Sequence, residues 1–165
     1  MLPCVTGDFT GVTIPGTRSE PGETQTVTNL VSPDYFKTME VPIIRDRAFD
    51  EHATRTAGTA SAVISLAMAR RFWPGQDALG KEFSAGRDQM YQVVGIAPDL
   101  QNLHLGQSDG PFFYAPLAAT SSDAVDAKIL MRTAANRPAA VSAIPGIVRQ
   151  LDANVIVTTE SYEQI

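Results

Sequence analysis

Histidine is the side chain best suited to acid–base chemistry near neutral pH, and this chain has two, His52 and His104. His52 follows Asp50 and Glu51 directly, so three potential metal ligands are adjacent in the sequence. Adjacent residues on a loop seldom converge on one ion, because zinc sites use separated ligands held by a supporting shell. We therefore interpret Asp50-Glu51-His52 as a solvated loop.

The second histidine lies in a polar stretch that contains the residue types of a hydrolase triad. His104 is flanked there by Asp99, Ser108 and Asp109. Such a triad depends on geometry, and no G-x-S-x-G turn between a strand and a helix accompanies these residues. A loop is the favoured interpretation. A small hydrolase built on residues 98–111 remains an alternative, and it requires a hydrogen bond between Ser108 and His104.

Other signatures of reactive or cofactor-binding sites are missing from the sequence. It contains no G-x-G-x-x-G, no Walker sequence, no H-E-x-x-H and no paired C-x-x-C, and its single cysteine, Cys4, has no partner for an internal disulfide. The sequence thus predicts no catalytic, cofactor-binding or metal-binding residue, no cofactor, and a protein that is not an enzyme.

Composition narrows the class of protein further. The chain has 165 residues, 44% of them hydrophobic, and its net charge of -5 comes from charges scattered along the sequence. We expect a packed core, and no nucleic-acid partner, because phosphate binding needs a basic face. No run approaches the roughly 20 apolar residues of a membrane-spanning helix.

The first half of the chain is expected to be rich in strands. Residues 1–25 carry scattered glycines and prolines and predict an irregular lead-in. The alternation in 26–31 predicts a strand, and Ser32 and Pro33 are placed to begin a short helix that ends before Pro42. A second strand, SAVISL, leads into a helix that Ser65 begins and Pro74-Gly75 ends.

The second half is expected to begin with strands and then change character. GQDALGKEF predicts a turn and a strand, and MYQVVGIAP a further strand. FFYAPL predicts an extended connector whose Pro116 lies at a sheet edge or a strand end. The segments DAKILMR, RPAAVSAIPGIVRQLD and ANVIVTT predict a right-handed βαβ unit, with a kink or break of its helix at Pro145.

The aromatic residues at the ends of these elements are interpreted as corners of a core. Tyr35, Phe36, Phe49, Phe72 and Trp73 are expected to be buried there rather than exposed for a partner.

The order of these motifs resembles a known family. VSPDYFKTMEVPIIRDRAF, SAVISLAMARRFWPGQDALGKEF, MYQVVGIAPDLQ and FFYAPL are similar to the MacB-like periplasmic core domain of ABC transporter permeases of the MacB/FtsX-like type. The resemblance runs from about residue 31 to 117 and continues more weakly to 165. Asp46 stands where the family usually has glycine and Ser65 where it commonly has asparagine, which leaves open a glycine-dependent turn at Asp46. Gly80 suits a backbone position of positive φ.

The resemblance implies an α+β fold of two lobes. Residues 26–110 would form a mainly β inserted lobe with one or two short helices, and residues 111–165 a βαβ half-lobe, the returning part of a second lobe. The first half of that lobe and the flanking membrane helices are expected to be missing from this chain, which would leave a sheet edge open to another chain.

The resemblance also implies a function. The chain would be a non-catalytic, periplasmic domain of an inner-membrane permease that transmits conformational change during ATP-driven export. The implied partners are a cytoplasmic ATPase, a second permease copy in a homodimer, and an accessory periplasmic protein. An alternative is a periplasmic module that binds a lipid, peptide or drug in an apolar pocket lined by Tyr91 or Phe112.

Overall fold

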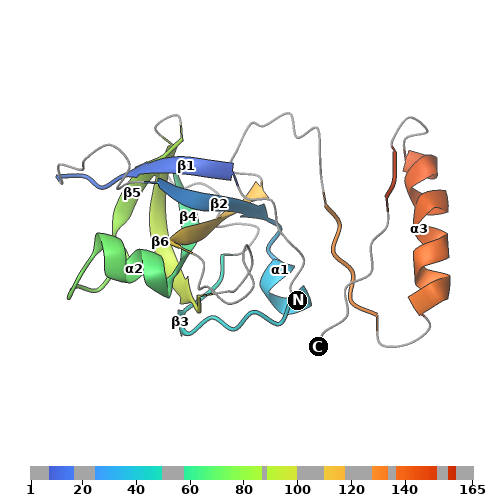
Figure 1. The fold of residues 1–165 in the computed structure, drawn as a ribbon, viewed down its shortest axis with the longest axis horizontal. Helices are drawn as coiled ribbons and strands as arrows, with labels where there is room; N and C mark the ends of the chain where they lie inside the picture. The colour runs from blue at the N-terminus through green and yellow to red at the C-terminus, as the bar shows by residue number, and fades with distance from the viewer. Residues whose placement is uncertain are drawn as a thin grey trace.

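The computed structural model describes residues 8–16, 25–49, 58–86, 89–99, 110–117, 128–133, 137–151 and 156–158. Its strands are β1 (Asp8–Thr13), β2 (Gln25–Val31), β3 (Arg45–Asp46), β4 (Thr59–Ser65), β5 (Glu82–Ala85), β6 (Gln89–Ala97) and β7 (Phe112–Pro116). Its helices are α1 (Tyr35–Thr38), α2 (Leu66–Phe72) and α3 (Arg137–Leu151). The fold is thus mixed α+β with a body made mostly of sheet, as predicted (Figure 1).

The sheet closes on itself. Its seven strands are ordered β3-β6-β4-β7-β2-β1-β5, and an additional pairing of β6 with β5 joins the two ends, so that β3 alone stands outside the ring. The pairs β2–β7 and β4–β6 are parallel, whereas the other pairs are antiparallel. A closed ring leaves fewer free strand edges than an open sheet does.

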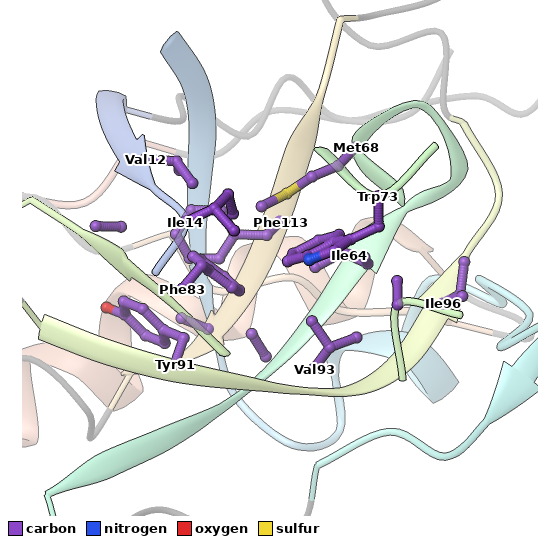
Figure 2. Packing of buried hydrophobic residues seen from close by; sticks show 14 of the residues in the cluster. Val12, Ile14, Ile64, Met68, Trp73, Phe83, Tyr91, Val93, Ile96 and Phe113 are labelled. Carbon is purple, nitrogen blue, oxygen red and sulfur yellow. The ribbon is translucent and has the colours of Figure 1, made fainter. Parts of the chain in front are cut away.

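The interior of this closed sheet is filled by side chains. The cluster combines large rings with several alanines. Phe83, Tyr91 and Phe113 lie with ring centroids 5.0 to 5.4 Å apart (Figure 2). Met68 from α2 and Trp73 after it join the same core. We call this set the inner core.

A bulge in β6 decides which of its side chains enter the inner core. Ala62 of β4 pairs with Val93 and Val63 pairs with Gly95, so Val94 is the extra residue. Val93 and, three positions later, Ile96 therefore both belong to the inner core.

A second core lies on the outer side of the closed sheet, beneath α1. We call it the outer core, and its buried members are Val31, Tyr35, Phe36, Val41, Phe49, Val63, Ala97, Phe112 and Tyr114. The predicted burial of the aromatic corners is confirmed for Tyr35, Phe36, Phe49 and Trp73, whereas Phe72 is only partly buried. The aromatic residues therefore anchor two cores rather than one.

Two predictions about the strands were wrong. The segment 1–25 is not wholly irregular, because Asp8–Thr13 forms β1, which pairs with β2 and β5. FFYAPL is not an edge connector, because β7 lies between β2 and β4 and all five of its residues are buried. One face of β7 contacts the inner core and the other contacts the outer core, so apolar residues are needed at every position and the sequence shows no alternation of apolar and polar residues. Pro116 does end the strand, as expected.

α1 and α2 lie where the sequence predicted helices, but only the cap of α2 was predicted correctly. Ser65 caps α2 as predicted, since its side chain accepts a hydrogen bond from the Met68 N–H. The residue that caps α1 is Asp34 rather than Ser32, and its side chain makes no capping hydrogen bond. The VPIIRDRAF segment contributes the two-residue strand β3.

The C-terminal part contains the predicted helix but not the predicted strands among its described residues. α3 runs through Pro145 to Leu151, so of the kink or break predicted at Pro145 the break does not occur. Residues 128–133 and 156–158 are outside any strand ladder, and thus the described residues form no paired βαβ unit. A strand is defined by its hydrogen-bonded neighbour, and neither segment has one among the described residues. No helix in the described ranges is long and apolar enough to span a bilayer.

Candidate functional site

The residues that suggested chemistry in the sequence contribute little to the described structure. Cys4, the Asp50-Glu51-His52 stretch, His104, Ser108 and Asp109 lie outside the described residues. Asp99 is described, and its carboxylate accepts a hydrogen bond of 2.6 Å from the Ala67 N–H at the start of α2. Among the residues that the structure describes, no group of three His, Cys, Asp or Glu residues is placed to hold a metal ion. Asp99 therefore has a structural role at the helix start.

The two residues considered for a ligand pocket lie on opposite sides of the sheet wall. Tyr91 is 4% exposed and stacks on Phe83 in the inner core. Phe112 is 3% exposed and packs edge-on against Tyr114 in the outer core. These two side chains therefore do not line one common pocket.

The outer core supports α1 through a group of aromatic rings. Phe36 contacts Tyr35, Phe49 and Tyr114 with ring centroids 5.0 to 5.6 Å apart, in edge-to-face geometry. Burial raises the pKa of the Tyr35 hydroxyl above its usual value. A four-residue helix is thus held by its side chains more than by its own hydrogen bonds.

The end of α1 has a left-handed residue that is not glycine. Val41 N–H donates to the Phe36 carbonyl and Glu40 N–H to the Lys37 carbonyl, which is the Schellman pattern of helix ends. Glu40 occupies the left-handed position with φ of 53°. Glycine is the usual residue there, because a side chain makes this conformation unfavourable.

The segment 128–133 is attached at this helix end. The Arg132 Nε–H donates a hydrogen bond of 2.7 Å to the Thr38 carbonyl, and an Arg132 terminal nitrogen lies 3.0 Å from Glu40 Oε1. Leu130, two residues earlier, packs against the outer core. In Figure 1 the segment is drawn in orange between α1 and α3. This junction of α1 with 128–133 is the candidate functional site.

Several large apolar side chains of the C-terminal part are exposed. In 128–133 they alternate with Leu130 and Arg132, which contact the closed-sheet body, and further ones lie on α3 and after it. The exposed residues are Ile129, Met131, Ile147, Leu151 and Ile156. In extended backbone, neighbouring side chains point to opposite sides, so Leu130 and Arg132 face the closed sheet while Ile129 and Met131 face away. The junction thus has one attached side and one apolar, exposed side.

Comparison with known proteins assigns the fold and the family. Residues 3–159 match the sequence profile of the MacB-like periplasmic core domain. The chain belongs to this family. No curated protein is significantly similar in sequence.

Two solved structures share the fold of this MacB-like domain. The periplasmic region of MacB from Actinobacillus actinomycetemcomitans is 14% identical, with a TM-score of 0.64 over 88% of this chain and 64% of that one. The extracellular domain of the noncanonic ABC-type transporter YknZ from Gram-positive bacteria is 19% identical, with a TM-score of 0.50 over 68% of this chain and 51% of that one. This chain therefore spans about two thirds of the first domain and half of the second.

The backbone at Asp46, where the resemblance left a glycine-dependent turn open, is left-handed. Its φ is 57°. Aspartate tolerates this conformation better than most residues do, so the turn forms here without glycine. Gly80 has a φ of 73°, which confirms the prediction for that position.

Sequence reasoning missed the attachment of Arg132 to α1. The Thr38–Arg132 hydrogen bond joins residues 94 positions apart. A lone arginine in an apolar stretch predicts no partner by itself. The one available signal was a glutamate, Glu40, at a helix end where glycine is expected.

Proposed function

We propose that this chain is the extracytoplasmic domain of an ABC transporter permease and that it transmits conformational change during ATP-driven export without catalysing a reaction. The observation that carries the proposal is the closed sheet with one core inside and a second core outside. Such a body resists deformation, because densely packed interiors transmit displacement rather than absorb it. A stiff domain is what a mechanical element of a transporter needs.

Family membership supports the setting of this proposal. MacB-like domains are named for their periplasmic position, and the structures compared above include the periplasmic region of MacB and the extracellular domain of an ABC-type transporter. We accordingly infer a periplasmic position beside an inner membrane, a cytoplasmic ATPase that supplies the energy, and a second permease copy in a homodimer. An accessory periplasmic protein is a further partner in this proposal.

We also propose that the C-terminal part belongs to a second lobe of which residues 111–165 form one half, β7 being shared with the closed sheet. The exposed apolar side of 128–133 and the half-buried stripe of α3, made of Val141, Ile144 and Val148, support this division. A half-lobe should associate through its apolar side.

The half-lobe can be tested by light scattering of the chain at several concentrations. We expect the mean mass to rise with concentration, and Ile129→Lys to reduce that rise. Phe9→Lys on β1 is the matched control, because Phe9 and Ile129 are both 77% exposed. A strictly monomeric chain, or equal effects of the two substitutions, would count against the half-lobe.

Mechanical transmission can be tested by distance measurements in the intact permease with its ATPase. With Cys4 and any other native cysteine of the permease replaced by serine, a spin label can be attached at Lys81→Cys, an exposed position directly before β5. The proposal predicts that the distance between labels on the two copies differs between the nucleotide-free and ATP-bound states. Identical distances in both states would refute it.

The same experiment needs an internal control for rigidity. A label pair at Lys37→Cys on α1 and Lys81→Cys directly before β5 lies within the body formed by the closed sheet and its two cores, and both side chains are exposed. Diluting doubly labelled copies with unlabelled ones isolates the distance within one copy. We expect this distance to be independent of nucleotide, and a change would show that the domain deforms instead of moving as a body.

A further inference from the structure

The attachment of 128–133 to the closed sheet depends on few side chains. Arg132 is hydrogen-bonded to the Thr38 carbonyl and paired with Glu40, and Leu130 contacts the outer core. The guanidinium group is planar and presents several donors in fixed directions, so it can bind a carbonyl and a carboxylate together. A lysine in its place would offer a point charge without this geometry.

The Thr38 carbonyl is an acceptor with a particular need for a donor. Thr38 is the last residue of α1, and the final carbonyls of a helix have no hydrogen-bond donor within the helix. A positive charge is also favourable at this end, where the carbonyl dipoles point outward. Arg132 thus supplies what the end of α1 lacks.

Glu40 retains a backbone conformation that glycine would adopt more easily. Its φ of 53° is the left-handed value of the Schellman position. What glycine would not provide is the carboxylate, whose Oε1 lies 3.0 Å from Arg132. The carboxylate is therefore the feature that distinguishes this residue from the better backbone choice.

We propose that Arg132 is a positioning residue, a clasp that fixes the C-terminal part on the closed sheet, and that Glu40 occupies the left-handed position in order to supply the clasp with its carboxylate. Both side chains are partly exposed, at 41% for Arg132 and 64% for Glu40. An exposed pair of this kind is weakened by salt and can open without disturbing either core. The clasp sets how firmly α3 follows the movement of the sheet.

The clasp can be tested on this chain alone, independently of the proposed function. With Cys4→Ser as background, spin labels at Lys81→Cys on the sheet and Gln150→Cys on α3 report the spread of distances between the two parts; both side chains are exposed. We expect Arg132→Gln and Arg132→Lys to broaden this distribution. Since a hydrogen bond to a charged group corresponds to about a tenfold change in an equilibrium, the detached fraction should rise about tenfold in Arg132→Gln.

The glutamate half of the clasp has its own variants. Glu40→Gln should broaden the distribution, and the double variant with Arg132→Gln should broaden it no more than Arg132→Gln alone, because both remove the same interaction. Glu40→Gly should raise the urea midpoint of unfolding while it broadens the distance distribution. A purely structural helix end would show the first effect without the second.

Arg45→Gln is the matched control. It removes an ion pair of 2.9 Å to Asp77, with exposures of 49% and 56%, whose two members both belong to the closed-sheet body. It should leave the distance distribution unchanged. Equal distributions in wild type and Arg132→Gln, each with an unchanged unfolding midpoint, would overturn the proposal. A broadening by Arg132→Gln without one by Glu40→Gln would overturn the role of Glu40.

Discussion

Replacement of Gly95 by alanine tests the bulge that organises β6. A Cβ atom at this position would lie 2.1 Å from the carbonyl oxygen of Arg47 and 3.4 Å from a methyl group of Val63. The first distance is about 1 Å shorter than a tolerable contact between carbon and oxygen. Since the obstacle is backbone, a rotamer change of a side chain cannot relieve it, and either the bulge or the segment 44–47 must move.

The cost of that movement follows from the contacts on the segment. Ile44 N–H donates to the Ile96 carbonyl at 2.9 Å, and Arg47 N–H to the Val94 carbonyl at 3.4 Å. At about 1 kcal/mol for each of the two hydrogen bonds and about 1 to 3 kcal/mol for overpacking, Gly95→Ala should lower the free energy of unfolding by about 3 to 5 kcal/mol.

Urea unfolding followed by tryptophan fluorescence measures this loss, because the single tryptophan, Trp73, lies in the inner core. Gly11→Ala is the control, since Gly11 is also in a strand but a Cβ there meets no atom within 4 Å. It should change the free energy of unfolding by less than about 0.5 kcal/mol. If Gly95→Ala costs no more than Gly11→Ala, the close approach of 44–47 to β6 is wrong.

Three further predictions concern single side chains. Asp46→Gly should raise the free energy of unfolding by about 0.5 to 1 kcal/mol in urea titrations. Glycine relieves the strain of the left-handed backbone, and the greater entropy of the unfolded chain offsets only part of that gain. Ser65→Ala should lower the free energy of unfolding by about 2 kcal/mol, because the buried hydroxyl accepts hydrogen bonds from the N–H groups of Met68 and Phe112. Thermal unfolding would detect the change, and an unaltered Tm would contradict the prediction. The free energy of unfolding should fall as pH rises through the ordinary pKa of tyrosine. The Tyr35 pKa is raised in the folded chain, so the unfolded chain loses this proton first. Tyr35→Phe should reduce this fall in a series of unfolding midpoints measured at increasing pH.

Local sequence patterns predicted those features that depend on a single residue and its near neighbours. Ser65 was predicted as the cap of α2 from its position before an apolar helical stripe, and its hydroxyl makes the capping bond. The positive φ of Gly80 followed likewise from the residue type in a turn. These features depend on neighbours within a few positions, so the sequence contains what determines them.

Features that depend on distant partners were beyond the sequence. The residues of β7 form an apolar run, and only their position between β2 and β4, with a core on each face, makes them a central strand. The pairing of β5 with both β1 and β6 closes the sheet, and neither strand sequence indicates that closure.

The sequence by itself determined the family, the strand-rich α+β class, the start of α2 at Ser65, and the burial of four of the five aromatic corners, Phe72 being the exception. The tertiary structure alone decided the closed sheet, its two cores and the attachment of Arg132 to the end of α1. The physical reason is range: capping, turn conformation and periodicity act between near neighbours, whereas strand pairing and the Thr38–Arg132 contact join parts of the chain that meet only after folding.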